Sequence, residues 1–317
     1  MLRYILQRLL AVIPLIVIVT AMVFILGQYG ARDLALSLTL QTNNGDFDPE
    51  MYETLREQMG LDQPVLVRYA QFIGGALRGD FGISYVLPGT PKISSLIATT
   101  LPISLQLGLA GIAILILVAV PLGTLAAFTR NSAIDQAIVT VSTIFSAIPP
   151  FVLAPLALWL IVARFRLLPV MGFGWHGLFS LETLLPAAVL AAAPMAGVLR
   201  YTRASVIEVL SQDYIVAARA RGVAGLGIVA GYVFKNAMTP VLTWLGISVG
   251  RLLSGSIFVE IVFGLPGFGS VAVTAFQGGD IQTVAATTLV SMIIIILVNL
   301  VVDLMYGLLD PRVRLAT

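Results

Sequence analysis

Long apolar stretches separated by short polar segments dominate this sequence of 317 residues. A helix needs roughly 20 apolar residues to cross the hydrocarbon core of a bilayer. Stretches of about that length recur six times, at about 9–28, 101–128, 136–163, 184–200, 237–262 and 283–306. The pattern therefore predicts an all-α polytopic membrane protein with six transmembrane helices.

The first stretch requires a choice between a signal peptide and a membrane helix. Arg3 and Arg8 give it a basic start, which both kinds of segment share. The apolar core of a signal peptide is only about 7–15 residues long and ends at a small-residue cleavage site. This stretch is longer and lacks such a site. We therefore expect residues 1–28 to form an uncleaved N-terminal transmembrane helix.

Residues 29–96 form the longest polar segment. They contain turn signals such as Asn43-Asn44-Gly45, and Asp48-Pro49-Glu50 is typical of a helix start. We expect a short helix at about 49–59. The segment is an insertion between the first two membrane helices.

Basic residues in the short loops predict the orientation, because such residues concentrate on the cytoplasmic side. Arg164 and Arg166 fall on the opposite side from the majority. The majority consists of Arg3, Arg8, Arg130, Arg200, Arg203, Arg219, Arg221, Lys235, Arg312 and Arg314. Both termini are accordingly expected in the cytoplasm, and residues 29–96 outside it.

Composition excludes several kinds of chemistry. The sequence is 58% hydrophobic and 11% charged, has no cysteine, and contains one histidine, His176. Disulfides and Cys/His metal sites are therefore excluded. No basic tract is dense enough for nucleic acid, and no nucleophile–base pair suggests a catalytic site. Neither lysine, Lys92 or Lys235, follows a glycine, so the chain lacks a P-loop.

The segment 213–222 is the main candidate for function. Its sequence is Asp213-Tyr214-Ile215-Val216-Ala217-Ala218-Arg219-Ala220-Arg221-Gly222. Alanines favour a helix with a low surface, and Gly222 can end it in a left-handed conformation. Such a helix between two membrane spans can dock into a soluble partner. The alternative is a loop that is basic only because it lies in the cytoplasm.

Local signals predict how this region begins. Ser205-Val-Ile-Glu208 fits a capping box, in which the serine and glutamate satisfy backbone N–H groups at a helix start. Ser211 or Asp213 can begin the next helical turn, where the helix dipole favours an acidic residue.

Two charged residues lie within or near the fifth apolar stretch. An arginine at the centre of a span, such as Arg251, costs about 2.5–3.5 kcal/mol on insertion scales. It is expected to face the bundle interior, a wet cavity or an acid. Glu260 lies nine residues further on, across roughly 13 Å of helix rise. Both are candidates for the pathway or its gate. For Arg251 the alternatives are a structural ion pair and a misplaced boundary of the span.

The chain resembles the permease subunits of bacterial ABC importers for dipeptides, oligopeptides and nickel, and within them the "B" half of the permease pair. The resemblance covers essentially the whole chain. The residues that carry it are Met1-Leu-Arg-Tyr with Arg8, Leu61-Asp-Gln-Pro64, Arg68-Tyr69, Gly79-Asp-Phe-Gly-Ile-Ser84, Asp213–Gly222, Asn236-Ala237 with Pro240, Val259-Glu260, Phe263-Gly-Leu-Pro-Gly-Phe-Gly269, Val302-Asp303 and Asp310-Pro-Arg-Val-Arg314.

The resemblance implies a type I ABC importer fold and a set of partners. The partners are a homologous "C" permease, two ATPase subunits that bind ATP and magnesium, and an extracytoplasmic substrate-binding protein. No cofactor is expected in this subunit. The implied domains are the first helix at 1–28, the extracytoplasmic segment at 29–96, the permease core at 97–310 with its cytoplasmic coupling loop at 201–236, and a cytoplasmic tail at 311–317.

Under this resemblance, the segment 213–222 corresponds to the family's coupling motif, Glu-Ala-Ala-x3-Gly-x9-Ile-x-Leu-Pro, which docks on the ATPase. Its ATPase-coupling residues are then Asp213, Tyr214, Ala217, Ala218, Arg219, Ala220, Arg221 and Gly222. The chain departs from the motif at Val216, which replaces the glutamate, and at Tyr232, Phe234 and Lys235. These departures leave the individual contacts open.

The expected function is half of the translocation pathway of an ATP-driven peptide importer in the bacterial inner membrane. A nickel importer of the same family is one alternative. A secondary transporter is another, but it would need internal inverted repeats and intramembrane coupling carboxylates. Glu260 and Asp303 are the candidate coupling carboxylates, and two such residues are weak evidence for a secondary transporter.

Overall fold

The computed structural model describes residues 2–30, 33–89, 91–168, 177–178, 180–223 and 225–309, and its regular elements there are all helices. Within these described residues, four helices are long and apolar enough to cross a membrane, or up to six when each of two bent helix pairs counts as one span. The predicted all-α membrane class is thus confirmed. The chain forms two compact units, which are Met1–Pro102 with Pro266–Ile296 and Ile103–Leu265 with Leu297–Thr317.

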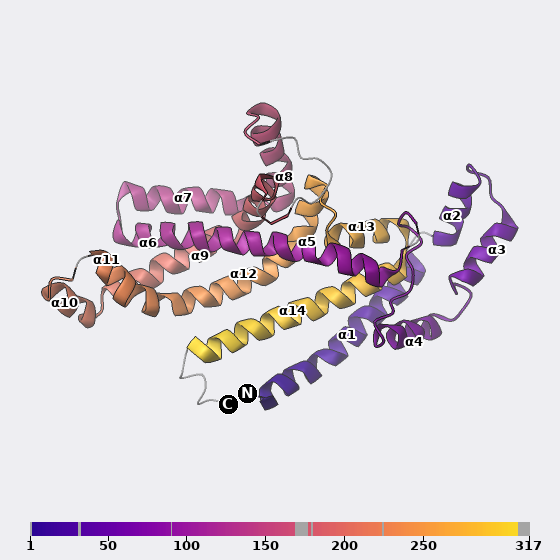
Figure 1. Ribbon diagram of the computed structural model, residues 1–317, viewed down its shortest axis with the longest axis horizontal. Coiled ribbons are helices and arrows are strands. Elements are labelled where there is room, and N and C mark those ends of the chain that lie inside the picture. Colours follow the sequence, from indigo (N-terminus) through magenta and orange to yellow (C-terminus); the bar gives the residue numbers. More distant parts are fainter. Residues whose placement is uncertain are drawn as a thin grey trace. The chain divides into compact units, whose positions relative to one another are not determined.

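The first unit contains α1, the short helices after it, and the region around α13. Its core consists of Phe24, Phe72, Ile93, Ala285, Ala286 and Leu289. Its elements are α1 (Leu2–Gly30), α2 (Leu34–Thr42), α3 (Pro49–Gln58), α4 (Val65–Ala76), the start of α5 (Ile93–Ile114), α13 (Phe268–Gly278) and most of α14 (Ile281–Leu309). Figure 1 gives their course along the chain.

Helix α4 is held against the first membrane helix by a polar and an aromatic contact. The hydroxyl of Tyr69 donates to the carbonyl of Val17 at 2.8 Å and lies 2.9 Å from the hydroxyl of Thr20. The ring of Phe24 packs edge-on against Tyr69 and beside Phe72. Buried aromatic pairs of this kind add to the area that they bury. These contacts fix α4, within the 29–96 segment, to α1.

The helix expected at about 49–59 is confirmed as α3. Asp48 accepts backbone hydrogen bonds from Glu50 and Met51, at 3.0 and 3.2 Å, and Pro49 occupies the first helical position. The hydroxyl of Tyr52 donates to Asp33, the N-cap of α2, at 2.7 Å. This hydrogen bond is the main reason that the pKa of Tyr52 is raised.

The second unit is built around α9, which packs against α12, α6, α7 and α8. Its elements are the rest of α5, η1 (Leu115–Ala119), α6 (Val120–Phe128), α7 (Ala133–Ala147), α8 (Pro150–Ala157), η2 (Leu158–Arg164), α9 (Leu181–Leu210), α10 (Asp213–Ala220), α11 (Gly225–Ile228), η3 (Val229–Val233) and α12 (Phe234–Phe263). The apolar span of α9 is 67% buried within the structure. It is therefore the central helix of this unit (Figure 1).

Glycines let α9 approach its neighbours closely. A Cβ at Gly123 of α6 would lie 2.6 Å from the carbonyl oxygen of Leu199. Gly197 lies against the indole of Trp244 of α12, whose ring also packs on Tyr201 with centroids 4.4 Å apart. Small residues at helix contacts are the usual device for close packing in membranes.

An ion pair joins the start of α7 to α9. The guanidinium of Arg203 donates from Nε and Nη2 to the two carboxylate oxygens of Asp135, both at 2.7 Å. The Asp135 side chain is 4% exposed, and it also accepts from the backbone of Asn131. The bidentate geometry fixes both side chains.

The third predicted span is not continuous. A break follows Ala147, where Pro149 and Pro150 interrupt the helix, and the chain bends by 102° between the two parts. Proline lacks the N–H of a helical hydrogen bond and clashes with the preceding turn. The stretch expected at 136–163 is therefore a broken pair of helices.

The fourth helix is longer than the expected 184–200, because α9 continues to Leu210. Arg200 and Arg203 do not end the helix. They continue it beyond the apolar stretch, and Arg203 reaches Asp135. Most of the predicted coupling loop at 201–236 is thus helical.

Candidate coupling surface

Helix α10 begins two residues after α9 ends. The hydroxyl of Ser211 donates to the carbonyl of Glu208 and so closes the end of α9. Gln212 is the N-cap of α10, and Asp213 lies in its first turn, as the helix dipole favours. Of the two expected starts, Ser211 and Asp213, the structure shows the helix beginning at Asp213.

The predicted capping box at Ser205 and Glu208 is wrong. Helix α9 runs through both residues, so no backbone N–H there needs a cap. The hydroxyl of Ser205 donates instead to the carbonyl of Ala237 on α12, at 2.9 Å. Ser205 therefore ties two long helices together beside α10.

One face of α10 is buried and the other is exposed. Ile215 and Ala218, three residues apart, are fully buried. Ile215 is anchored in a cluster with Ala127, Val206, Val209, Ile228, Val233 and Ala237. Burial of one isoleucine side chain contributes about 1.5–3 kcal/mol. The cluster draws on α6, α9, α11, η3 and α12, so α10 is fixed to the ends of several long helices (Figure 1).

The exposed face of α10 is the candidate coupling surface. It consists of Asp213, Tyr214, Val216, Ala217, Arg219, Ala220, Arg221 and Gly222. Two arginines and one aspartate leave it with a net positive charge, and its alanines keep the backbone accessible. The surface has the low profile and basic end that a groove in a soluble partner can receive.

Ala218 differs from the role expected for it. The sequence suggested that it contributes to the docking surface, but the structure leaves its side chain no exposed area. The 3.6-residue period of the helix explains this, because Ala218 lies on the same face as Ile215. Ala217 and Ala220 remain on the exposed face.

The end of α10 is a Schellman motif, and Gly222 has the left-handed conformation expected for it. Gly222 adopts φ +79°, and its N–H donates to the carbonyl of Arg219 at 2.9 Å. The N–H of Val223 donates to the carbonyl of Ala218 at 3.2 Å. Glycine is favoured at this position because it has no Cβ. A Cβ there would meet nothing within 4 Å, so the space beside Gly222 is open.

Side chains of η3 and α12 contact Tyr214 of α10. The ring of Tyr214 stacks on Tyr232 with centroids 6.5 Å apart. The side-chain amide of Asn236 donates to the Tyr214 hydroxyl at 3.2 Å and to the Tyr232 carbonyl at 2.9 Å. Sequence reasoning missed this support and the anchoring role of Ile215. The spacing of Ile215 and Ala218 was the available signal.

Glu260 lies away from α10, at the opposite end of α12. It is fully buried, and the hydroxyl of Ser104 on α5 donates to its carboxylate at 2.6 Å. In this structure Glu260 joins two helices within the second unit. Arg251 lies in α12, but its side chain is outside the described part of the structure. His176 is likewise outside the described residues.

Among the described residues, no group of three His, Cys, Asp or Glu side chains could hold a metal ion.

Comparison with known proteins identifies the family. Residues 119–315 match the model for the binding-protein-dependent transport system inner membrane component, and residues 1–98 match its N-terminal region. The oligopeptide transport system permease protein AppB of Bacillus subtilis is 34% identical, over 99% of this chain and 100% of that protein. The dipeptide transport system permease protein DppB of Lactococcus lactis is 33% identical, with the same coverage.

A solved structure shows the same fold. A chain of the MetNI methionine ABC transporter, in an inward-facing conformation, is similar with a TM-score of 0.56 and 18% sequence identity. The similarity covers 68% of this chain and 97% of that one. The type I importer fold expected from the sequence is thereby confirmed. The chain belongs to the family of binding-protein-dependent transport system inner membrane components, and it is an ABC permease of the inner membrane and not a nucleotide-binding subunit.

Proposed function

We propose that this chain forms half of the translocation pathway of an ATP-driven peptide importer. The observation that carries the proposal is similarity over nearly the full length, at 32–34% identity, to permeases named for dipeptide and oligopeptide transport. The match includes the N-terminal region as well as the permease core. Substrate class is therefore inferred from the whole chain and not from a single motif.

In this proposal, α10 couples the pathway to ATPase subunits. The exposed face carrying Ala217 and Arg219 docks in a groove of the ATPase. When the ATPases close, they push α10, and the anchor Ile215 carries that movement into the ends of α6, α9 and α12. A tightly packed anchor transmits displacement because packed interfaces move as units.

The complete transporter is proposed to contain a homologous second permease, two ATPases and an extracytoplasmic substrate-binding protein. The two permeases together enclose the pathway. ATP and magnesium bind to the ATPases, and this subunit carries no cofactor. Residues 29–96 receive the binding protein or guide the substrate, with α2 and α3 as the helices available for it.

In the proposed membrane orientation, both termini of the chain and α10 lie in the cytoplasm. The basic residues near the spans support it. Because the chain has no cysteine, single-cysteine variants can be labelled without removing native thiols. In cells whose inner membrane is sealed and whose outer membrane has been removed, an impermeant maleimide should label Gln58→Cys on α3. It should label Ala220→Cys on α10 only after the membrane is opened. The reverse pattern would overturn the orientation.

ATP-dependent uptake tests the proposed function. The chain is co-purified with its partner subunits, reconstituted in vesicles and supplied with the binding protein and a radiolabelled dipeptide. We expect uptake that requires ATP and is competed by unlabelled peptides. Uptake of nickel in place of peptide would assign the nickel alternative. Uptake driven by an ion gradient without ATP would instead indicate a secondary transporter.

A further inference from the structure

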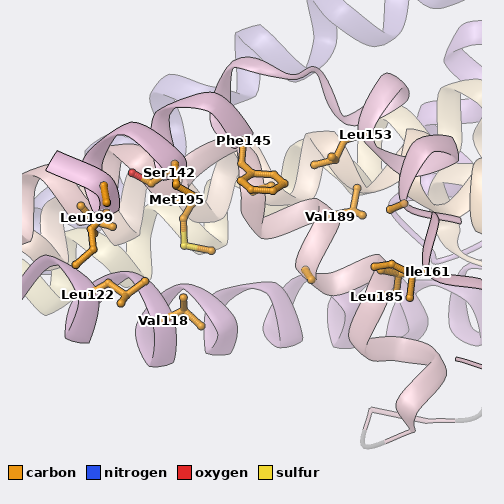
Figure 2. Close-up of a pocket in the computed structure, with 16 residues that line it drawn as sticks. Val118, Leu122, Ser142, Phe145, Leu153, Ile161, Leu185, Val189, Met195 and Leu199 are labelled. Carbon is orange, nitrogen blue, oxygen red and sulfur yellow. The ribbon is translucent and has the colours of Figure 1, made fainter. Parts of the chain in front are cut away.

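An open apolar groove crosses the second unit (Figure 2). It has a volume of about 540 Å³ and lies between the surfaces of η1 and α6, α7, α8 and η2, and α9. Fifteen of its sixteen lining residues are apolar, and the remaining one is Ser142. The Ser142 hydroxyl donates to the carbonyl of Val139 on its own helix. The groove therefore offers almost no polar partner.

The lack of polar partners argues against a peptide as the occupant. Each backbone N–H and C=O of a peptide would need a hydrogen-bond partner in place of water. The groove cannot provide them, so we separate it from the translocation pathway. An occupant must be a hydrocarbon or an apolar side of another helix.

The length of the groove suits a hydrocarbon chain. On α9 the groove extends from Leu185 to Leu199, which is about 21 Å of helix rise. An extended acyl chain can lie along that length, and its methylene groups need no polar partner there.

The sequence explains why the groove exists. Ala188 and Ala192 give α9 a low surface along the groove floor. The break at Pro149 and Pro150 turns α8 by 102° from α7, so these two helices do not close over α9 as one straight span would. The lining side chains on both sides of the break are visible in Figure 2, with Phe145 before it and Leu153 after it.

Positive charge lies at one end of the groove. Arg203 is one helical turn beyond Leu199 on the same face of α9, and its side chain is 27% exposed. It pairs with Asp135 at the start of α7. Arg130 is exposed and acts electrostatically on the Asp135 carboxylate. Two guanidinium groups and one carboxylate leave a net charge of +1 where the acyl chain would emerge.

We propose that this groove binds an anionic phospholipid, with one acyl chain along α9 between α6 and α7 and the headgroup phosphate beside Arg130 and Arg203. The lipid fills the space that the broken third span leaves open. Arginine offers further donors beyond the two that Asp135 occupies, and these suit a phosphate. The site is specific for the sign of the headgroup and tolerant of chain length.

A photoactivatable phospholipid tests the proposal. Two probes carry a diazirine in the same acyl chain, one on phosphatidylglycerol and one on phosphatidylcholine. Each is added to nanodiscs containing the chain assembled with its partner subunits, and adducts are located by mass spectrometry. We expect adducts on groove residues such as Phe145 and Met195. The anionic probe should give about fivefold more, as one net positive charge predicts.

Variants distinguish groove binding from general contact with the bilayer. Ala188→Phe fills the groove and should abolish these adducts. Ala193→Phe is the matched control, because Ala193 is exposed on the same helix but does not line the groove. Arg130→Gln should remove the preference for the anionic probe without removing the adducts.

Three results would overturn the proposal. Equal labelling by the two probes would show that the groove has no site selective for an anionic headgroup. Adducts unaffected by Ala188→Phe would place the lipid elsewhere. Adducts that occur in the isolated chain but disappear on assembly would show that a partner subunit occupies the groove. If Ala188→Phe does not fold, Arg130→Gln and the comparison of probes still decide between these outcomes.

Discussion

Ser84 and Asp280, which lie 196 residues apart in the sequence, form a hydrogen bond of 2.7 Å from the serine hydroxyl to the carboxylate. Both side chains are buried in the first unit. Asp280 also accepts from the backbone N–H and the hydroxyl of Thr283, at 3.0 and 2.8 Å. A single carboxylate thus caps the start of α14 and fixes the segment that ends at Ser84.

Ser84→Ala should loosen that segment selectively. The substitution leaves the Asp280 carboxylate with one buried hydrogen bond fewer, at a cost of about 1–3 kcal/mol. Hydrogen exchange of residues 79–89 should become faster while α9 stays protected. Ser95→Ala is the control, because the Ser95 hydroxyl bonds only locally to Lys92 and is exposed. Unchanged exchange in Ser84→Ala would show that this hydrogen bond does not hold the segment.

Asp135→Ala should lower the thermal midpoint of the purified chain in detergent. It removes a bidentate pair and leaves Arg203 partly buried without its carboxylate, at a cost of about 1.5–3 kcal/mol. The control is Glu53→Gln, which breaks an exposed pair with Arg56 at 3.8 Å and should have no measurable effect. Equal effects of the two substitutions would contradict the structural role of Asp135.

Ala218→Arg should destabilise the anchor of α10. The residue is fully buried beside Ile215, so an arginine there must either bury a charge or expose the cluster. We expect the variant to insert in the membrane but to give rapid proteolysis between residues 211 and 224. If its proteolysis matched that of the unmodified chain, the anchoring face would be assigned wrongly.

Arg251→Ala should alter transport while assembly survives. An arginine within a membrane span is costly, and arginines in such positions commonly serve a function such as a gate or a specificity contact. We expect the KM or the rate of peptide uptake to change by about fivefold. The complex should still purify with its partners in the same ratio. Unchanged uptake kinetics would end the pathway hypothesis for this residue.

Much of the fold was accessible from the sequence because membrane helices are long and apolar. The left-handed Gly222, the capped start of α3 and the helix at Asp213 also follow from local rules. The break in the third span was signalled by Pro149 and Pro150, but the size of the bend depends on packing.

Tertiary contacts account for what local rules missed. Ser205 and Glu208 fit the local pattern of a capping box, but α9 continues through both residues. Tertiary contacts stabilise the continued helix, because Arg203 pairs with Asp135 and the Ser205 hydroxyl donates to the carbonyl of Ala237. In the sequence, Ala218 cannot be told apart from Ala217 and Ala220. Only the structure shows that Ala218 is buried and the other two are exposed. The bond between Ser84 and Asp280 joins segments that no local pattern connects.

The number of peptides taken up per ATP hydrolysed tests the coupling role of α10 most directly. Ala217→Trp places a bulky side chain on the exposed face of α10 without disturbing the anchor. Gln136→Trp places the same side chain at an exposed position of α7, outside α10 and the cluster that anchors it. In vesicles with the complete transporter, we expect Ala217→Trp to lower this ratio by at least about fivefold and Gln136→Trp to leave it unchanged. An unchanged ratio in Ala217→Trp would contradict the assignment of α10 as the coupling helix.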